Sequence, residues 1–288
     1  MPSPPLLPPS SHLPIFWLTD FGLTESWTGV MKAVALRLGF AGAMVDLTHG
    51  IAPQDLIGGM MALDDALPFL PEACVVIAVV DPGVGSSRRP LLAQTGARFF
   101  IGPDNGLLTP AITAESRCCE IIAHGPINPA GSATFHGRDV FTPAGALAAM
   151  GHSMESLGRP IIDPTLTPFP TPHLNPDGTW TFEIIHIDHF GNLTTCGRSH
   201  IAPFGGMGTT RGHVPAAPPV GWHLLTGPAR IAGLSRTFAD VSEGQPVAYF
   251  NASGWLEVAI RNGNAQAALG VNVGDTVTAF RPAGCPAP

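Results

Sequence analysis

The stretch that decides the fold is residues 74–89, CVVIAVV followed by DPGVGSSRR. Its first half is a short unbroken run of apolar, mostly β-branched residues, which is typical of a strand buried in a parallel sheet. Its second half is a loop in which Gly83 and Gly85 permit a ligand to approach the backbone closely. Asp81 and Arg88 stand at the two ends of this loop. The loop lacks the Gly-Lys-Ser/Thr ending of a phosphate loop, so a nucleoside triphosphate is not indicated.

Strand-like and helix-like segments alternate on both sides of this stretch. Such alternation is typical of an open α/β sheet. In such sheets ligands bind at the carboxyl ends of the strands. Asp20, Asp81 and Asp104 each follow a strand-like run, so we expect them to gather at one edge. The expected strands are 15–19, 43–47, 74–80 and 98–101, and the expected helices are 28–38, 54–67, 106–114 and 140–149.

A change of pattern divides the chain in two. Residues 161–178 are rich in proline, which is a linker signature, and we expect residues 15–160 to form the α/β domain that precedes this linker. Beyond it, short β-like runs at 181–187, 247–250, 256–260 and 275–280 are separated by turn residues. Residues 179–288 are therefore predicted to form a smaller C-terminal all-β domain, a barrel or a sandwich.

The first residues and the composition exclude several classes of protein. Residues 1–14 are rich in Pro and Ser without the basic and apolar parts of a signal peptide, and we expect a disordered lead-in. The net charge of −7 argues against nucleic acid as a partner. The longest apolar runs are far shorter than the ~20 residues that span a bilayer. Five cysteines without CxxC spacing indicate reduced thiols in the cytoplasm and no zinc site.

Three polar clusters of the first domain have both a functional and a structural interpretation. Asp20, in a Thr-Asp-Phe-Gly stretch, suits the two hydroxyls of a ribose, or else caps a helix or a turn. The loop from Asp81 to Arg88 binds a ligand, or else is an ordinary turn with a surface ion pair. In Gly-Pro-Asp-Asn-Gly, Asn105 is mainly a turn residue.

Two further clusters contain a histidine or an aromatic residue. His136, in Thr-Phe-His-Gly-Arg-Asp, is a candidate for proton transfer, or else a structural histidine. In residues 187–192, Ile-Asp-His-Phe-Gly-Asn, Asn192 can pair with the edge of an adenine and Phe190 can stack on its face. The structural alternative for this cluster is a β-turn.

Taken in order, these motifs resemble those of the S-adenosyl-L-methionine (SAM) hydroxide adenosyltransferase family, also called SAM hydrolases, which are relatives of the fluorinating and chlorinating enzymes. The matching stretches are 19–22 with 29–32, 45–54, 79–89, 102–108, 134–143, 188–192 and 251–265. They extend over nearly the whole chain after residue 14. A set of motifs in this order is highly specific.

The resemblance implies an α/β N-terminal domain, a C-terminal β-barrel and a homotrimer, with substrate held between the N-terminal domain of one subunit and the C-terminal domain of its neighbour. It implies no cofactor and no metal. It places the catalytic set on Asp81, Arg88 and His136. By the same resemblance, the substrate-binding residues are Asp20, Asn105, Asp188, Phe190, Asn192, Ser253 and Arg261, with Asp188 at the methionine amino group and Arg261 at the carboxylate.

The implied reaction is hydrolysis of SAM to adenosine and L-methionine. A sulfonium is already a good leaving group, so a water or hydroxide has only to attack C5′ of the ribose in line with sulfur. Arg88 would favour hydroxide-like character, and Asp81 and His136 would orient the water and accept its proton. No carbonyl or phosphoryl group needs a metal. His186 and His189 lie on a strand-like segment, where their spacing would point the rings to opposite faces.

Three alternatives remain. Halogenating relatives carry an insertion after the 81–89 loop and a serine that helps to hold halide, whereas this chain has no room for the insertion and has Gly137 at the place of the serine. A non-catalytic adenosine- or SAM-binding module would not need Asp81, Arg88 and His136. A metal-dependent hydrolase would lose activity on chelation. One departure from the family is Trp27, which stands where the family has a tyrosine, and we expect it to form a pocket wall.

Overall fold

The computed structural model describes residues 12–128, 130–200 and 221–282. The chain divides into two compact units, Met1–Pro168 and Phe169–Pro288, and each is described by itself. Within the described residues, no helix is both long and apolar enough to cross a membrane. Residues 1–11 of the expected lead-in lie outside the described part of the chain.

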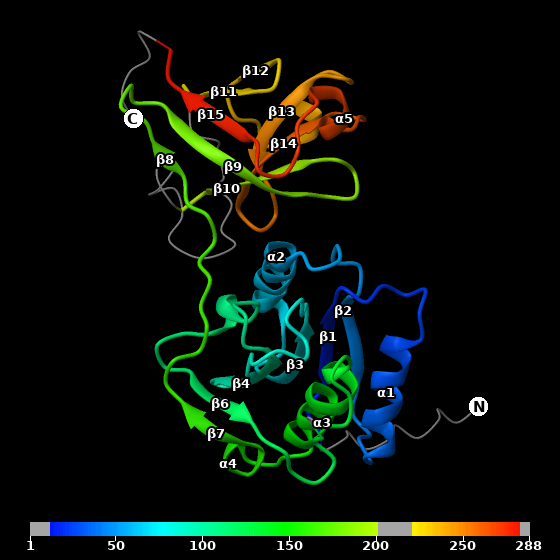
Figure 1. Cartoon of the computed structure of the whole chain (residues 1–288). Coiled ribbons are helices and arrows are strands. Elements are labelled where there is room, and N and C mark those ends of the chain that lie inside the picture. Colours follow the sequence, from blue (N-terminus) through cyan, green and yellow to red (C-terminus); the bar gives the residue numbers. More distant parts are fainter. Residues whose placement is uncertain (1–11, 129, 201–220, 283–288) are drawn as a thin grey trace, which may run out of the picture. The chain divides into compact units, whose positions relative to one another are not determined.

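A seven-stranded sheet forms the centre of the first unit (Figure 1). Its strand order is β2-β1-β3-β5-β4-β6-β7. Strands β2, β1, β3 and β5 are parallel to one another, whereas the pairs β5–β4, β4–β6 and β6–β7 are antiparallel. The sheet is therefore mixed, with a parallel half as the sequence predicts. The strands are β1 Ile15–Thr19, β2 Met44–Thr48, β3 Ala73–Val79, β4 Pro90–Thr95, β5 Ala97–Pro103, β6 Arg117–Ile121 and β7 Gly158–Ile161.

Helices pack on this sheet over an apolar core. The core joins α1 and α3 to β1, β3 and β5 through side chains such as Trp17, Met31 and Ile77. Gly145 of α3 lies so close to the sheet that an added Cβ would stand 2.5 Å from Ile77 Cδ1, so only glycine fits there. The helices are α1 Trp27–Arg37, α2 Leu56–Ala66, α3 Thr142–Ala149 and α4 Met154–Leu157, with a π-helical turn η3 Gly137–Phe141 and 3-10 turns η1 Leu67–Phe69 and η2 Thr109–Ala111.

The prediction of a helix over residues 106–114 is wrong. The structure has only the 3-10 turn η2 there. Gly106 has a φ of +97°, and the Thr109 hydroxyl donates to the Gly106 carbonyl. Pro110 lacks the N–H that a continuing helix needs. The turn chemistry of Asn105 and Gly106 therefore outweighs the helical spacing of the apolar residues.

The second unit is an antiparallel β domain (Figure 1). Its strand order is β12-β11-β15-β9-β10-β14-β13, and β8 pairs with β9. The two end strands of this order, β12 and β13, are in contact, which makes the sheet nearly barrel-like. The predicted all-β class of this part is confirmed. The elements are β8 His173–Leu174, β9 Trp180–Ile187, β10 Leu193–Arg198, β11 His223–Thr226, β12 Ala229–Ala232, η4 Phe238–Asp240, β13 Pro246–Phe250, β14 Trp255–Ile260, α5 Ala265–Leu269 and β15 Thr276–Phe280.

Candidate active site

Three strands of the first unit end at the same edge of the sheet. Thr19 of β1 pairs with Val79 of β3, and β3 runs in parallel register with β5. Asp20, Asp81 and Asp104 follow the ends of these three strands. Because the strands are parallel, all three aspartates lie at one sheet edge, as the sequence predicts.

A cluster of three side chains forms beside this edge. The Arg88 guanidinium donates through Nε to Asp81 Oδ1 at 3.0 Å and through Nη2 to Asp81 Oδ2, which gives a two-pronged ion pair. The same Nη2 lies 2.8 Å from Nδ1 of His136. Residues 81 and 88 belong to one loop, whereas His136 immediately precedes η3. The structure thus brings together the three residues predicted to be catalytic, although 48 positions separate Arg88 from His136.

The cluster is nearly closed to solvent. The Arg88 and Asp81 side chains are 9% and 5% exposed. The buried ring of Phe141 lies under the guanidinium, with Arg88 Cζ 5.2 Å from its centroid, and it meets the His136 ring edge to face. Burial and the neighbouring Arg88 charge hold the pKa of His136 below its ordinary value, against smaller opposing effects of Asp81 and Asp139. His136 is therefore a neutral imidazole near pH 7.

One hydrogen-bond donor of the cluster is unused. Nη1 of Arg88 is buried and has no hydrogen-bond partner within the described residues. A buried guanidinium N–H without an acceptor is costly. It is therefore suited to a water, a hydroxide or an atom of a bound ligand.

Asp20 is held by a strained residue of the next loop. Its Oδ2 accepts the backbone N–H of Gln54 at 2.8 Å. Gln54 has a φ of +65°, a left-handed conformation that is uncommon for a residue other than glycine and often marks functional sites. Within the described chain, Oδ1 of Asp20 accepts no hydrogen bond, so one carboxylate oxygen is available to a ligand. Contact with ribose hydroxyls stays a prediction.

Asn105 serves the chain itself. Its Nδ2 donates to the Val80 carbonyl at 2.9 Å, and its Oδ1 accepts from the Leu107 N–H at 3.1 Å. Nδ2 therefore ties the loop after β5 to the end of β3, and Oδ1 stabilises the turn within that loop. Its predicted contact with substrate is not tested by this arrangement.

Aromatic side chains surround Gly137. Phe21 meets Trp27 and Phe135 edge to face, with centroid distances of 5.9 and 6.0 Å. A Cβ added at Gly137 would lie 3.2 Å from Met31 Sδ and Phe21 and 3.3 Å from Phe135. This space has no room for a serine without movement of its neighbours. Trp27 is 48% exposed, and its role as a pocket wall stays a prediction.

In the second unit, Asp188 organises the turn between β9 and β10. Its Oδ1 accepts the backbone N–H groups of Phe190 and Asn192, and its Oδ2 accepts Nδ2 of Asn192 at 2.9 Å. Asn192 is consequently fixed and buried, while Phe190 projects with 71% exposure. The β-turn alternative is correct for this segment. A binding role is compatible with it, because the turn presents an exposed aromatic face beside a fixed amide.

A second turn depends on a buried carboxyl group. Ser253 lies in a turn whose backbone N–H groups donate to Oδ1 of Asn251, and Nδ2 of Asn251 donates to Glu257 at 2.9 Å. Glu257 is 6% exposed and also accepts the hydroxyls of Thr194 and Tyr249. The sequence analysis did not single out Glu257, although this residue lies within the matching stretch 251–265. A charged residue inside the apolar strand-like run 255–260 was the signal that could have indicated a buried carboxyl group.

Arg261 follows β14 and is engaged with the backbone. Its Nη1 donates to the carbonyl oxygens of Val241 at 2.6 Å and Ala239 at 3.5 Å. These bonds fasten the segment before β13. The predicted contact of Arg261 with a substrate carboxylate is not tested by them.

Among the described residues, no group of three or more His, Cys, Asp or Glu side chains is arranged to hold a metal ion. His186 lies in β9, but His189 lies past its end in the turn, so the argument from strand alternation does not apply to this pair. The ring of His189 packs against Phe190.

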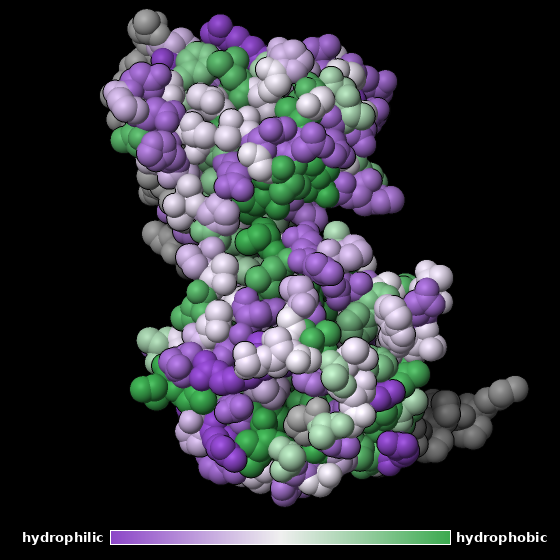
Figure 2. Space-filling view, viewed as in Figure 1, coloured by the Kyte–Doolittle hydropathy of each residue, from purple (hydrophilic) through white to green (hydrophobic). Residues whose placement is uncertain are grey.

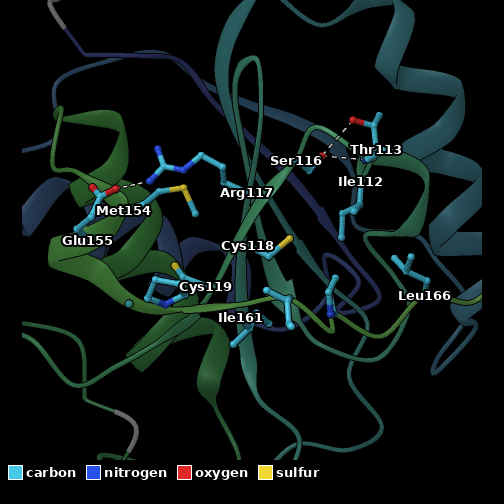
Figure 3. A pocket seen from close by; sticks show the side chains of 15 residues that line it. Ile112, Thr113, Ser116, Arg117, Cys118, Cys119, Met154, Glu155, Ile161 and Leu166 are labelled. Atoms are coloured by element: carbon cyan, nitrogen blue, oxygen red, sulfur yellow. Dashed lines mark hydrogen bonds and ion pairs between the residues drawn. The ribbon is translucent and has the colours of Figure 1, made fainter.

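A hollow of the first unit lies away from the cluster around Arg88. It has a volume of about 510 Å³ and is lined by residues from β6, α4, β7 and the segment after β7 (Figure 3). Figure 3 shows the ion pair of Arg117 with Glu155 at one side and Cys118 near the centre. Asp81, Arg88 and His136 are not among its lining residues. The hollow is therefore separate from the cluster of Asp81, Arg88 and His136.

Comparison with known proteins identifies the class. Residues 15–158 match the SAM hydroxide adenosyltransferase N-terminal domain, and residues 182–278 match the C-terminal domain of the same family. An (R)-S-adenosyl-L-methionine hydrolase of Thermus thermophilus is 40% identical over 272 residues, which cover 91% of this chain and 97% of that protein. The chain belongs to the SAM hydroxide adenosyltransferase family.

Two further comparisons agree with this family. A crystal structure of an uncharacterized conserved protein from Thermotoga maritima is 29% identical, with a TM-score of 0.78 and coverage of 93% of this chain and 100% of that one. A fluorinase of Actinopolyspora mzabensis is 26% identical and covers 85% of this chain and 89% of that protein. The halogenating relatives are thus more distant than the hydrolase.

Proposed function

We propose that this protein hydrolyses S-adenosyl-L-methionine to adenosine and L-methionine. The observation that carries the proposal is the cluster of Asp81, Arg88 and His136, in which the buried Nη1 group of Arg88 has no hydrogen-bond partner among the described residues. A module that only binds SAM has no use for a cation, a carboxylate and a neutral imidazole joined in this way. The names of relatives that are 34–40% identical support the same reaction.

The proposed step is a displacement at C5′ of the ribose. A water oxygen forms the new bond to carbon as the carbon–sulfur bond breaks, and the bonding pair leaves with the sulfur of methionine. Arg88 Nη1 stabilises negative charge on the attacking oxygen. The released proton passes to the carboxylate of Asp81 and then to solvent, because Nδ1 of neutral His136 already accepts from Arg88 and its Nε2 carries a proton. Holding the water in a nearly closed site lowers the entropic part of the barrier.

The remaining predicted residues bind the two ends of the substrate. Asp20 offers a free carboxylate oxygen to the ribose hydroxyls, and Phe190 and Asn192 offer an aromatic face and an amide to adenine. Asp188, Ser253 and Arg261 are proposed for the methionine end. Asn105 contributes by holding the strand ends that carry Asp81.

Halide is disfavoured as the nucleophile. Met31, Phe21 and Phe135 lie so close to Gly137 that the serine the resemblance associates with halide would fit there only if these neighbours moved. The test is to incubate the purified protein with SAM, with and without EDTA and chloride, and to separate the products. Equal amounts of adenosine and methionine that are insensitive to EDTA are expected. A 5′-chloro product, or loss of turnover with EDTA, would contradict the proposal.

We also propose a cytoplasmic homotrimer without cofactor, whose sites join the first unit of one subunit to the second unit of its neighbour. Large apolar side chains that are exposed on the isolated chain, including Leu23, Phe69, Ile162 and Phe190, support burial between subunits. On the face drawn in Figure 2, hydrophobic groups are scattered among hydrophilic ones.

Mixing two inactive variants tests this arrangement. Asp81→Asn damages the first unit and Asp188→Ala damages the second. Refolding the two together should restore activity, because some mixed trimers contain sites with no substitution. Activity that stays absent in a mixture shown to be trimeric would place both halves of each site in one subunit.

A further inference from the structure

Arg89, the neighbour of Arg88, forms an ion-pair cluster of its own. Its Nε and Nη2 both contact Oδ2 of Asp104, at 2.8 and 2.7 Å. Its Nη1 donates to the carboxylate of Asp163 at 2.9 Å, and its Nη2 also donates to the Asp163 carbonyl at 2.7 Å. Arg88 and Arg89 thus point to different carboxylates, Arg88 to the catalytic cluster and Arg89 to the end of β5.

Asp104 is the buried centre of this second cluster. Its side chain is 2% exposed, against 73% for Asp163. Its Oδ1 accepts the backbone N–H of Thr165 at 2.6 Å, and its own N–H donates to the Arg89 carbonyl at 2.9 Å. One carboxylate therefore fastens three segments: the end of the 81–89 loop, the end of β5 and the segment 163–165.

The position of Arg88 depends on how this loop end is held. Apart from its guanidinium contacts, the one hydrogen bond that Arg88 makes to the described residues runs from its N–H to the Ser86 hydroxyl of the same loop, at 3.3 Å. The next residue is fixed on both its backbone carbonyl and its side chain by Asp104. Two N–H groups of Arg89 converge on one oxygen of Asp104, while its third nitrogen contacts Asp163, so the planar guanidinium is fixed in orientation as well as in distance.

We propose that Arg89 and Asp104 are positioning residues, which hold the backbone at Arg88 so that its guanidinium lies between Asp81 and His136. The consequence for turnover rests on the proposed function, whereas the consequence for the geometry of the cluster does not. Neither residue touches the reacting atoms. Their effect reaches the reaction through Arg88 alone.

The test compares Asp104→Asn with Asp163→Asn. Both remove one charge from Arg89, but only Asp104 is buried and bonded to the loop end. For Asp104→Asn we expect kcat to fall roughly 10- to 100-fold, as misplacement of catalytic groups produces, with little change in KM. Asp163→Asn should keep the kcat of the unaltered protein.

The second readout is the pKa of His136, measured without substrate by NMR on histidine-labelled protein, with the His136→Gln variant to assign the signal. Of the charges that act on this ring, Arg88 lowers its pKa, and Asp81 and Asp139 raise it. If Asp104→Asn releases Arg88, the pKa of His136 rises toward the ordinary value of about 6.5. A general loss of stability would not produce this shift.

The outcomes separate the two proposals. A raised His136 pKa in Asp104→Asn supports the positioning role even if the protein does not hydrolyse SAM. An unchanged His136 pKa in a folded Asp104→Asn variant would overturn it, with or without a loss of kcat. The same shift in Asp163→Asn would overturn it as well. If Asp104→Asn does not fold, Arg89→Lys keeps the charge and removes the planar guanidinium that contacts both Asp104 and Asp163. The same two outcomes for the His136 pKa then support or overturn the proposal.

Discussion

Nη2 of Arg88 lies 2.8 Å from Nδ1 of His136. Because a guanidinium can only donate, Nδ1 must be the acceptor, and the imidazole is then neutral with its proton on Nε2. Asp81 accepts two further bonds from the same guanidinium. The three groups therefore form one hydrogen-bonded unit centred on the cation.

Replacement of Asp81 or His136 by alanine should reduce kcat by about 10²-fold or more, which is the usual contribution of positioned acid–base groups. Turnover is followed as adenosine released from SAM. The matched control is His152→Ala, because His152 is exposed and its side chain has no assigned role. Full turnover in folded Asp81 or His136 variants would remove these residues from the mechanism.

The acid limb of kcat/KM should lie below the ordinary histidine value of about 6.5. Burial and the charge of Arg88 lower the pKa of His136, so the neutral ring persists into more acidic solution and is protonated, with loss of activity, only at lower pH. Folding stability changes in the same direction. The pKa of His136 is lower in the folded protein than in the unfolded chain, so between these two values the unfolded chain binds more protons. The contribution of His136 to the free energy of unfolding is therefore present in full above the unfolded-state pKa and is lost as pH falls toward the folded-state pKa. An acid limb that lies above 6.5 would contradict the assignment.

Gly137→Ser should destabilise the protein by about 1–3 kcal/mol, since overpacking forces Met31, Phe21 and Phe135 to move. It should also lower SAM turnover and yield no 5′-chloro product in chloride. Denaturant unfolding and product analysis measure the two effects. A variant of normal stability would show that the space beside Gly137 is wider than the structure indicates, and chlorination would show that this one position decides the nucleophile.

Tyr249→Phe should cost about 1–3 kcal/mol of unfolding free energy, because it leaves buried Glu257 without one of its three donors. Burial and the charge of Glu257 raise the pKa of Tyr249 far above its ordinary value, so its hydroxyl remains a donor at every usable pH. Glu155→Gln, which breaks an exposed ion pair with Arg117, should leave the unfolding midpoint nearly unchanged. Equal effects of the two substitutions would contradict the importance of the buried network.

The parallel half of the first sheet was predictable because each of its strands is a short apolar run that ends in a polar turn. The run at β3 and the aspartates at 20, 81 and 104 are examples. Strand β4 begins directly at Pro90, next to Arg89, and its alternation is too brief to stand out. The helix predicted at 106–114 failed because local turn bonds at Asn105 and Gly106 compete with apolar spacing.

The members of the catalytic cluster were predictable from their motifs, but their geometry was not. Sequence order does not reveal that Arg88 reaches His136 across the fold, nor that Arg89 turns away to Asp104. The partner of a buried carboxyl group depends on strand pairing. Glu257, for example, meets Thr194 and Tyr249 because β14 lies between β10 and β13.

Hydrolysis of SAM in water enriched in ¹⁸O reports which bond the attacking water forms. We expect one ¹⁸O atom in the 5′ hydroxyl of adenosine and none in methionine, with equal amounts of the two products. Adenosine without the label, or a product other than adenosine, would contradict attack of water at C5′.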